Sequence, residues 1–379
     1  MKKKIAAIII FIVVLVFPMV SWPMLFPLDN TKLNENRNPT PFPKFDNEFF
    51  INFDKFFTDH LPFRNDYIKL YSQIDMGINN LYQKMLASMG VPFYITKNEA
   101  IVGKEDWLFF EGEAGKSLAY YQAANLPSEE ELAAMVESVE KVSNYFKSQG
   151  KEFVFYIAPN KEQVYSEYMP NGIHVRSEVK RVDMIVDYFH KHSDVKILYP
   201  KEELLEAKKE RQIYYKHDTH WNEAGGYYGS LPLLEALGIT PGEVTFTEKE
   251  VTGGDLADMI ASGEKHDTAY EVKYRPEIEV TGPEIDLTPE IIKGKVHCSS
   301  TNTNGKNLFV LGDSFRVSMI EVLAKEYTTS NFYSCIWFPG DDYCQEEIEQ
   351  ADTIVFETVE RGEQGFFDLI NEFIRIYNL

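Results

Sequence analysis

The sequence predicts an α/β fold in which helices cover both faces of a mostly parallel sheet. Short apolar segments alternate with amphipathic segments from residue 128 to the C-terminus, which is the pattern of strands joined by helical crossovers. Hydrophobic residues make up 44% of the 379 residues and aromatic residues make up 14%. This composition supports a large packed core and is unlike that of disordered chains.

Each element of the predicted domain has a local signal. The predicted strands are short apolar runs at residues 153–158, 195–199, 307–311 and 353–356. The predicted helices have amphipathic periodicity and occupy residues 128–148, 179–192, 202–211, 222–237, 315–326 and 366–377. A strand pair is expected within residues 101–110, and strand-like alternation runs from residue 244 to residue 280. An aromatic helical segment at residues 49–82 is broken at Leu61-Pro62.

The N-terminal residues predict the cellular compartment of the domain. Lysines at positions 2–4 precede an uncharged stretch from Ile5 to Leu28, which is long enough to cross a hydrocarbon core roughly 30 Å thick. We expect a single-pass membrane anchor with its N-terminus in the cytoplasm and the rest of the chain outside. A cleaved signal peptide is the alternative. The expected divisions are an anchor or signal segment at 1–28, a linker at 29–46, a helical segment packing on the body at 47–100 and a main domain at 101–379.

Charge and cysteine content narrow the classes of partner. The formal net charge of −21 repels phosphate backbones and argues against a nucleic-acid partner. Cys298, Cys335 and Cys344 are too few for a disulfide framework and lack the spacing of a zinc ribbon. Cys335 and Cys344 either pair across a turn at Pro339-Gly340 or remain free thiols. The sequence has no glycine-rich loop that would cradle a nucleotide, and no cofactor is expected.

A serine at the end of a predicted strand is the first candidate for chemistry. The apolar run 307–311 leads into Gly312-Asp313-Ser314, and a predicted helix follows. Open α/β sheets bind ligands at the carboxyl ends of their strands, and the start of a helix favours an oxyanion. Ser314 is therefore a candidate nucleophile. The alternative is that Asp313 or Ser314 only caps the helix.

The segment around His220 supplies what a nucleophilic serine needs. Such a serine needs a base, and the base needs an acceptor that orients its ring. Asp218 lies two residues before His220, close enough to bond Nδ1 while Nε2 faces elsewhere, and Trp221 is expected to wall the pocket against water. Two alternatives remain open. His217, His220 and Asp218 could ligate a metal, or the loop is polar and purely structural.

These motifs resemble those of a known family. The Asp-Thr-His-Trp motif at residues 218–221 and the later Gly-Asp-Ser-Phe motif at residues 312–315 are similar to the SGNH-hydrolase-like domain of the alginate O-acetyltransferase (AlgX/AlgJ) type and to the related DHHW proteins. Further segments resemble that family in the same order, at residues 58–64, 102–109, 158–161, 254–257 and 357–361. This chain has Thr219 where the DHHW pattern has a second histidine, which leaves Asp218 and His220 in place.

The resemblance implies an activity and partners. It implies that Ser314, His220 and Asp218 form a triad that moves an acetyl group, through an acyl-serine, onto a hydroxyl of an exported or cell-wall polysaccharide. Because acetyl-CoA is cytoplasmic, it also implies a membrane-bound O-acyltransferase partner that supplies the acetyl group. Two alternatives use the same fold: a carbohydrate O-acetyl esterase with the same triad, and a non-catalytic glycan-binding protein.

The sequence also offers candidates for oxyanion and substrate contacts. The N–H of Ser314 is one expected oxyanion donor, and the second is expected from the Asn160 loop or from Gly254. Arg361 matches a position of the family near the site, and Trp221 is a further substrate-contact candidate. Lys161 is expected to be a solvated loop lysine.

Overall fold

The computed structural model describes residues 12, 39–45, 48–61, 63–91, 94–112, 116–260, 265–285, 287–337 and 344–379. The predicted anchor at 1–28 falls outside these residues except for Ile12, and so does most of the linker at 29–46. Among the helices that are described, none combines the length and the apolar character needed to cross a bilayer. The division of the chain into anchor, linker and domain therefore stays a prediction.

The centre of the protein is a seven-stranded sheet with the order β5-β4-β12-β10-β11-β9-β8. Its strands are β4 (Glu152–Ala158), β5 (Lys196–Leu198), β8 (Val280–Thr281), β9 (Lys295–Ser300), β10 (Asn307–Gly312), β11 (Thr329–Ser334) and β12 (Thr353–Val359). The five strands from β5 to β11 pair in parallel, which confirms the predicted mostly parallel sheet. β9 and β8 extend it in the antiparallel sense, which the sequence pattern did not predict.

Alternating side chains on the buried strands hold helices on both faces of the sheet. On β4, Phe153, Phe155 and Ile157 enter one core, and Val154, Tyr156 and Ala158 enter the other. The helices of the first core are α5 (Glu129–Ser148), α7 (Arg181–His192), α13 (Gln345–Gln350) and α14 (Glu363–Tyr377). The helices of the second core are α6 (Lys161–Val164), α8 (Lys201–Ala207), α9 (Glu223–Ala236), η4 (Ser314–Met319) and α12 (Ile320–Ala324). Burial on both sides explains why these strands read as continuous apolar runs.

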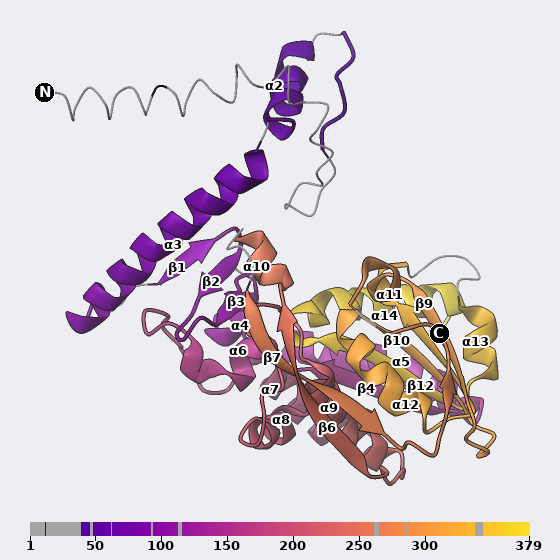
Figure 1. The fold of residues 1–379 in the computed structure, drawn as a ribbon. Helices are drawn as coiled ribbons and strands as arrows, with labels where there is room; N and C mark the ends of the chain where they lie inside the picture. The colour runs from indigo at the N-terminus through magenta and orange to yellow at the C-terminus, as the bar shows by residue number, and fades with distance from the viewer. Residues whose placement is uncertain are drawn as a thin grey trace, which may run out of the picture.

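Smaller units surround this three-layer body (Figure 1). A three-stranded antiparallel sheet contains β1 (Ile95–Lys97), β2 (Ala100–Val102) and β3 (Leu108–Phe110), so the strand pair expected within 101–110 is confirmed. The predicted alternation at 244–280 forms a hairpin of β6 (Val244–Thr252) and β7 (His266–Tyr274), with α10 (Asp255–Met259) between the strands. The aromatic segment forms α2 (Phe49–Asp59) and α3 (Arg64–Ser88), which project from the body and are separated at the predicted break.

Several boundaries differ from the expected ones. The helix expected at 202–211 ends at Ala207, and the helix expected at 315–326 begins as the 3₁₀ turn η4 before α12. The 3₁₀ turn directly follows β10 at the start of this helix, where such turns are frequent, and Asp313 caps it. Cys298, Cys335 and Cys344 are free thiols.

A close approach between α9 and η4 fixes the two segments that carry the candidate residues. Gly226 of α9 lies against the backbone of Ser318, and a Cβ atom at position 226 would meet the Ser318 carbonyl oxygen at 2.2 Å. The Trp221 indole Nε1 donates to the Phe315 carbonyl oxygen at 2.9 Å, just ahead of the same contact. The loop before α9 is thereby held beside the turn after β10.

We predict that Gly226→Ala destabilises the protein by roughly 1–3 kcal/mol, because the added methyl group would overlap the backbone of η4. Gly365→Ala is the matched control, since position 365 is an exposed site in α14 with no atom within 4 Å of the new methyl group. That control should be neutral or stabilising by about 0.5–1 kcal/mol. Chemical denaturation of both variants measures the difference, and equal unfolding free energies would contradict the proposed close packing.

Candidate active site

The turn after β10 exposes one hydroxyl and ties down its neighbours. A Cβ atom at Gly312 would lie 2.3 Å from the Glu357 carboxylate, so the turn requires glycine there. The Asp313 carboxylate accepts hydrogen bonds from Phe315 N at 2.9 Å and from Val359 N at 2.6 Å. Asp313 therefore caps the turn and anchors the end of β12, which leaves the Ser314 hydroxyl free for another partner.

The Ser314 hydroxyl faces the imidazole of His220. The distance from Ser314 Oγ to His220 Nε2 is 2.7 Å, although the two residues are 94 positions apart. On the other side of the ring, His220 Nδ1 lies 2.6 Å from Asp218 Oδ1. The three side chains that the sequence singled out thus form one hydrogen-bonded chain of hydroxyl, imidazole and carboxylate. This geometry allows Nδ1–H to donate to Asp218 while Nε2 accepts the hydroxyl proton.

Electrostatics supports an ionised carboxylate beside a basic imidazole. Burial by itself would raise the pKa of Asp218, but the charge of His220 and hydrogen bonds from His220 and Asp255 outweigh burial and lower it to about 2. Burial would likewise lower the pKa of His220, but the Asp218 carboxylate, with a smaller contribution from Asp255, raises it. The imidazole is therefore a stronger base than an isolated histidine.

Asp255 is a second carboxylate at the site that the sequence reasoning missed. Its carboxylate accepts from Thr219 N at 2.7 Å and from Thr219 Oγ1 at 2.6 Å, and its backbone N–H donates to Asp218 Oδ2 at 3.0 Å. Asp255 Oδ2 lies 3.9 Å from His220 Nδ1. Burial and the nearby Asp218 charge raise the pKa of Asp255. In the sequence, residues 254–257 resemble the family and Gly254 is a possible oxyanion donor, but neither observation predicted a role for the Asp255 carboxylate.

Gly254 and Trp221 have supporting positions. Gly254 has a φ of +129°, and a Cβ there would meet the His217 carbonyl oxygen at 2.3 Å, so the start of α10 can press against the loop before His220. Trp221 is fully buried, with its ring centroid 5.2 Å from that of Phe315. Its ring therefore lies in the core beneath the site, and the expectation that it walls the pocket against water stays a prediction.

Asn160 and Arg361 form a second polar pair at the carboxyl ends of β4 and β12. Asn160 is 1% exposed, and its side-chain Oδ1 accepts from Arg361 Nη1 at 3.2 Å. The Asn160 backbone N–H donates to Glu360 Oε2 at 3.0 Å. The Arg361 guanidinium also lies over the Phe315 ring, 5.3 Å from its centroid. Because Arg361 holds the Asn160 side-chain oxygen, the amide nitrogen on the other side of the same group points away from Arg361.

Lys161 lies in a different environment from the one expected. Its side chain is buried, and its Nζ donates to the carbonyl oxygens of Tyr215, Lys216 and Asp218 at 3.1, 3.1 and 2.7 Å. The expectation of a solvated loop lysine is wrong because α6 carries residue 161 under the segment 215–220, which we call the dyad loop. Sequence alone gives no signal of this burial.

His217 does not join the other candidate metal ligands. Its Nε2 lies 3.0 Å from Asp106 Oδ2, while its Nδ1 is buried with no hydrogen-bond partner among the described residues. Among the described residues, the group with suitable ligand atoms close together is Asp218, His220 and Asp255, whose atoms lie within 4.8 Å of one another. In that group His220 Nε2 already faces Ser314, so the same atoms form the hydroxyl–imidazole–carboxylate chain.

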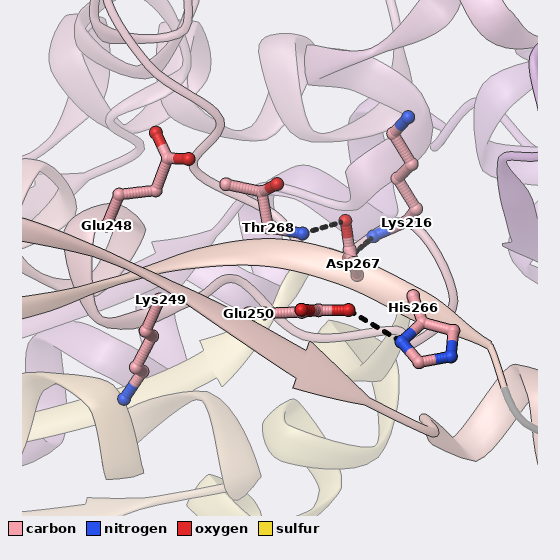
Figure 2. Close-up of a pocket in the computed structure, with 7 residues that line it drawn as sticks. All are labelled: Lys216, Glu248, Lys249, Glu250, His266, Asp267 and Thr268. Atoms are coloured by element: carbon pink, nitrogen blue, oxygen red, sulfur yellow. Dashed lines mark hydrogen bonds and ion pairs between the residues drawn. The ribbon is translucent and has the colours of Figure 1, made fainter.

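A polar surface pocket of about 350 Å³ adjoins the dyad loop (Figure 2). It lies along the β6–β7 hairpin and is lined by Lys216, Glu248, Lys249, Glu250, His266, Asp267 and Thr268. The Asp267 carboxylate accepts from Lys216 N at 2.6 Å and from Thr268 N at 2.7 Å, as Figure 2 shows. The hairpin therefore binds the outer side of the dyad loop.

Comparison with known proteins agrees with the predicted resemblance. Residues 100–283 match the family model described as SGNH hydrolase-like domain, acetyltransferase AlgX. This range contains Asn160, Asp218, His220 and Gly254 and ends before Ser314. No curated protein matches the chain. The resemblance to AlgX-type SGNH-hydrolase-like domains is thus confirmed for this segment.

Several solved structures are similar to this chain at low sequence identity. A DHHW family protein from Eubacterium siraeum is 16% identical, with a TM-score of 0.53, over 74% of this chain and 97% of that one. PatB1 of Bacillus cereus is 15% identical, with a TM-score of 0.48, over 71% and 96%. The O-acetyltransferase domain of Pseudomonas putida AlgJ is 15% identical, with a TM-score of 0.46, over 72% and 99%. At these identities, the DHHW protein supports the fold and no specific activity.

We predict that Asp218→Asn lowers the pKa of His220. The carboxylate charge that raises this pKa would be lost, and burial, which favours the neutral ring, would then dominate. Asp187→Asn is the control, because Asp187 pairs with Lys191 on an exposed surface of α7. An NMR titration of the His220 ring in each variant measures the shift. An unchanged His220 pKa in Asp218→Asn would show that the carboxylate does not act on the imidazole.

Proposed function

We propose that this protein is an extracytoplasmic O-acetyltransferase that moves an acetyl group, through an acyl-serine at Ser314, onto a hydroxyl of an exported or cell-wall polysaccharide. One observation carries the proposal. The Ser314 hydroxyl, the His220 imidazole and the Asp218 carboxylate are joined by hydrogen bonds of 2.7 and 2.6 Å, and Asp218 and His220 lie in the segment that matches the AlgX-type family model. This is the arrangement that activates a serine for acyl transfer.

The first half-reaction acylates the serine. His220 Nε2 accepts the Ser314 proton while Ser314 Oγ attacks the carbonyl carbon of an acetyl donor. The carbonyl oxygen becomes an oxyanion, and the imidazolium is stabilised by the ionised Asp218 carboxylate, whose low pKa keeps it charged at neutral pH. When the tetrahedral intermediate collapses, the bond to the donor breaks and the leaving group takes the proton from His220. The acetyl-serine ester remains.

The second half-reaction delivers the acetyl group. His220 Nε2 accepts a proton from a hydroxyl of the glycan, and the glycan oxygen attacks the ester carbonyl carbon. The bond to Ser314 Oγ then breaks, and the serine recovers its proton from the imidazolium. Water in place of the glycan would give ester hydrolysis with the same groups, so the acceptor decides between transferase and esterase chemistry.

The oxyanion has two proposed hydrogen-bond donors: the backbone N–H of Ser314 and the side-chain amide of Asn160. Ser314 is the first residue of η4, where helix geometry leaves backbone N–H groups without intrahelical partners. Arg361 holds the Asn160 side-chain oxygen, which orients the amide nitrogen as a donor. The Asp255 N–H, by contrast, is already bonded to Asp218, so the turn at Gly254 supports the carboxylate. Arg361 adds a positive charge near the developing oxyanion.

The proposed location and acetyl donor rest on the N-terminal sequence. The uncharged stretch from Ile5 to Leu28 is proposed to anchor the chain, with the domain outside the cytoplasmic membrane. Acetyl-CoA would remain on the other side, so the acetyl group is proposed to arrive from a membrane-bound O-acyltransferase partner. The polysaccharide acceptor would reach Ser314 from the exterior.

We predict that p-nitrophenyl acetate forms an acetyl ester on Ser314 and that Ser314→Ala lowers the rate by at least about 10³-fold. Mass spectrometry of the intact protein and of its peptides locates the adduct. Ser148→Ala, at an exposed helix end, is the control and should keep the wild-type rate. Adding oligosaccharide acceptors distinguishes acetyl transfer from hydrolysis. A Ser314→Ala variant that is acylated as fast as the wild type would remove the basis of the proposed enzyme.

We also predict that Asn160→Ala lowers the acylation rate about 10²–10³-fold, because one oxyanion donor is lost. Asn371→Ala is the control, since Asn371 bonds Ser138 on the exposed side of α14. Stopped-flow measurement of p-nitrophenol release gives the rate constant for each variant. A rate constant for Asn160→Ala within about twofold of the wild type would assign the second donor elsewhere.

A further inference from the structure

The dyad loop has its carbonyl oxygens turned into the protein. Lys216 O accepts from Leu108 N of β3 at 2.9 Å, and His217 O accepts from Ala257 N of α10 at 3.1 Å. Buried carbonyl groups cost free energy unless they are hydrogen-bonded. Neighbouring elements therefore have to supply hydrogen-bond donors to this loop. One of these donors is the Lys161 ammonium group, which bonds the carbonyl oxygens of Tyr215, Lys216 and Asp218.

The Lys161 ammonium suits this position because its three N–H groups match three carbonyl oxygens and aromatic rings lie beside it. An ammonium group has three N–H donors, and Lys161 makes three hydrogen bonds to three backbone carbonyls. Its Nζ also lies over two aromatic rings, 5.8 Å from the centroid of Trp107, which precedes β3, and 5.3 Å from the centroid of Phe109 in β3. Aromatic faces stabilise a desolvated cation. The charge is thus held by neutral oxygens and ring faces.

We propose that Lys161 is a positioning residue for the proposed acyl transfer, in which its ammonium gathers the three carbonyls and so places Asp218 and His220 toward Ser314. The inference rests on the proposed function. The path is short, because the carbonyl with the 2.7 Å bond to Lys161 belongs to Asp218 itself, and His220 is two residues further along. Asp267 and Asp255 accept from the backbone N–H groups of Lys216 and Thr219, and Lys161 donates to the loop from the inner side.

The protonation state of Lys161 gives this role a pH signature. Burial lowers the pKa of Lys161 to about 8, and the charges of four nearby carboxylates that do not bond it partly oppose this shift. These are Asp255 on α10, Glu162 on α6, Asp218 on the dyad loop and Asp267 on β7. Above this pKa, a neutral amine has two N–H donors for three carbonyls. The acylation rate should therefore fall as the pH rises through about 8.

Folding stability should respond to the same proton in the opposite direction. The unfolded chain keeps the Lys161 proton up to a pKa of about 10.4, whereas the folded protein releases it near 8. Between these values the unfolded state binds more protons, so the contribution of this group to stability rises with pH. Between about pH 8 and pH 10.4, loss of the Lys161 proton should not destabilise the fold. A fall in the acylation rate over this interval would therefore report lost positioning and not unfolding.

The test compares Lys161→Met with Lys208→Met in the full chain. Lys208 is a matched control, because it also donates to a backbone carbonyl and lies over a tyrosine ring, yet its carbonyl belongs to Val164 outside the dyad loop. The readout is the rate constant for acetylation of Ser314 by p-nitrophenyl acetate between pH 6 and about 9.5. The amplitude of the reaction reports the folded fraction separately.

Lys161→Met should lower the rate constant by about 10–100-fold, as expected for displaced catalytic groups, and should lose the alkaline fall seen in the wild type. Lys208→Met should keep both the rate and the fall. If Lys161→Met does not fold, Lys161→Arg is measured instead. Its guanidinium stays charged, so a lower rate without the alkaline fall is expected. A rate constant and pH profile equal to those of the wild type, or a loss confined to the amplitude, would overturn the inference.

An NMR measurement separates this inference from the proposed function. The ring signals of His220 report its hydrogen bond to Asp218 whether or not an ester forms. If the wild type forms no acyl-serine but Lys161→Met shifts the His220 signals while Lys208→Met does not, the proposed function fails and the positioning role stands. If the wild type is acylated and the His220 signals and the rate do not change in Lys161→Met, the positioning role fails alone.

Discussion

The geometry of the site depends on the hydrogen bonds of one largely buried carboxylate. Asp218 accepts from His220 Nδ1 and His220 N through one oxygen and from Asp255 N through the other. These three bonds orient the imidazole, close the dyad loop on itself and join it to α10. Because an ionised carboxylate in this setting needs several donors, the loop, α10 and the histidine ring have to adopt mutually compatible positions. A change in any one of them would leave a buried charge without its partners.

The α/β architecture brings this carboxylate to the serine. Ser314 follows β10 at the carboxyl edge of the parallel strands, while the dyad loop leads into α9 on one face of the sheet. Two contacts with the backbone of η4 hold the dyad loop and the Ser314 turn together. The Trp221 indole donates to the Phe315 carbonyl oxygen, and Gly226 lies against Ser318. Packing between α9 and η4 therefore sets the separation of the imidazole and the hydroxyl, and the loop residues set the orientation within that distance.

Local motifs allowed part of this site to be predicted. Asp218 and His220 are two residues apart, and Ser314 follows an apolar strand, so their chemistry could be inferred from neighbouring residues. Lys161 and Asp255 could not, because their importance comes from burial against loops distant in the chain. The fold shows the same division. The buried parallel strands were predicted from apolar runs, whereas β9 and β11 contain polar residues that carry no clear strand signal and were missed. Trp221 was placed at the site, but its burial beneath the site was not foreseen.

The buried ionisable groups around the site lower the stability of the fold but fix the positions of the atoms around them. Lys161, Asp218 and Glu360 are ionisable groups removed from water, and each costs desolvation free energy that an apolar core residue would not. Glu360 illustrates the exchange. Burial raises its pKa to about 7, yet it accepts hydrogen bonds from the Asn160 backbone, Gln163 and Tyr199. Apolar replacements would leave the Asn160 turn and the dyad loop without directional contacts. Fixed polar contacts are retained where atoms must be held to within about 0.5 Å, and this buried polarity indicates the site independently of any motif.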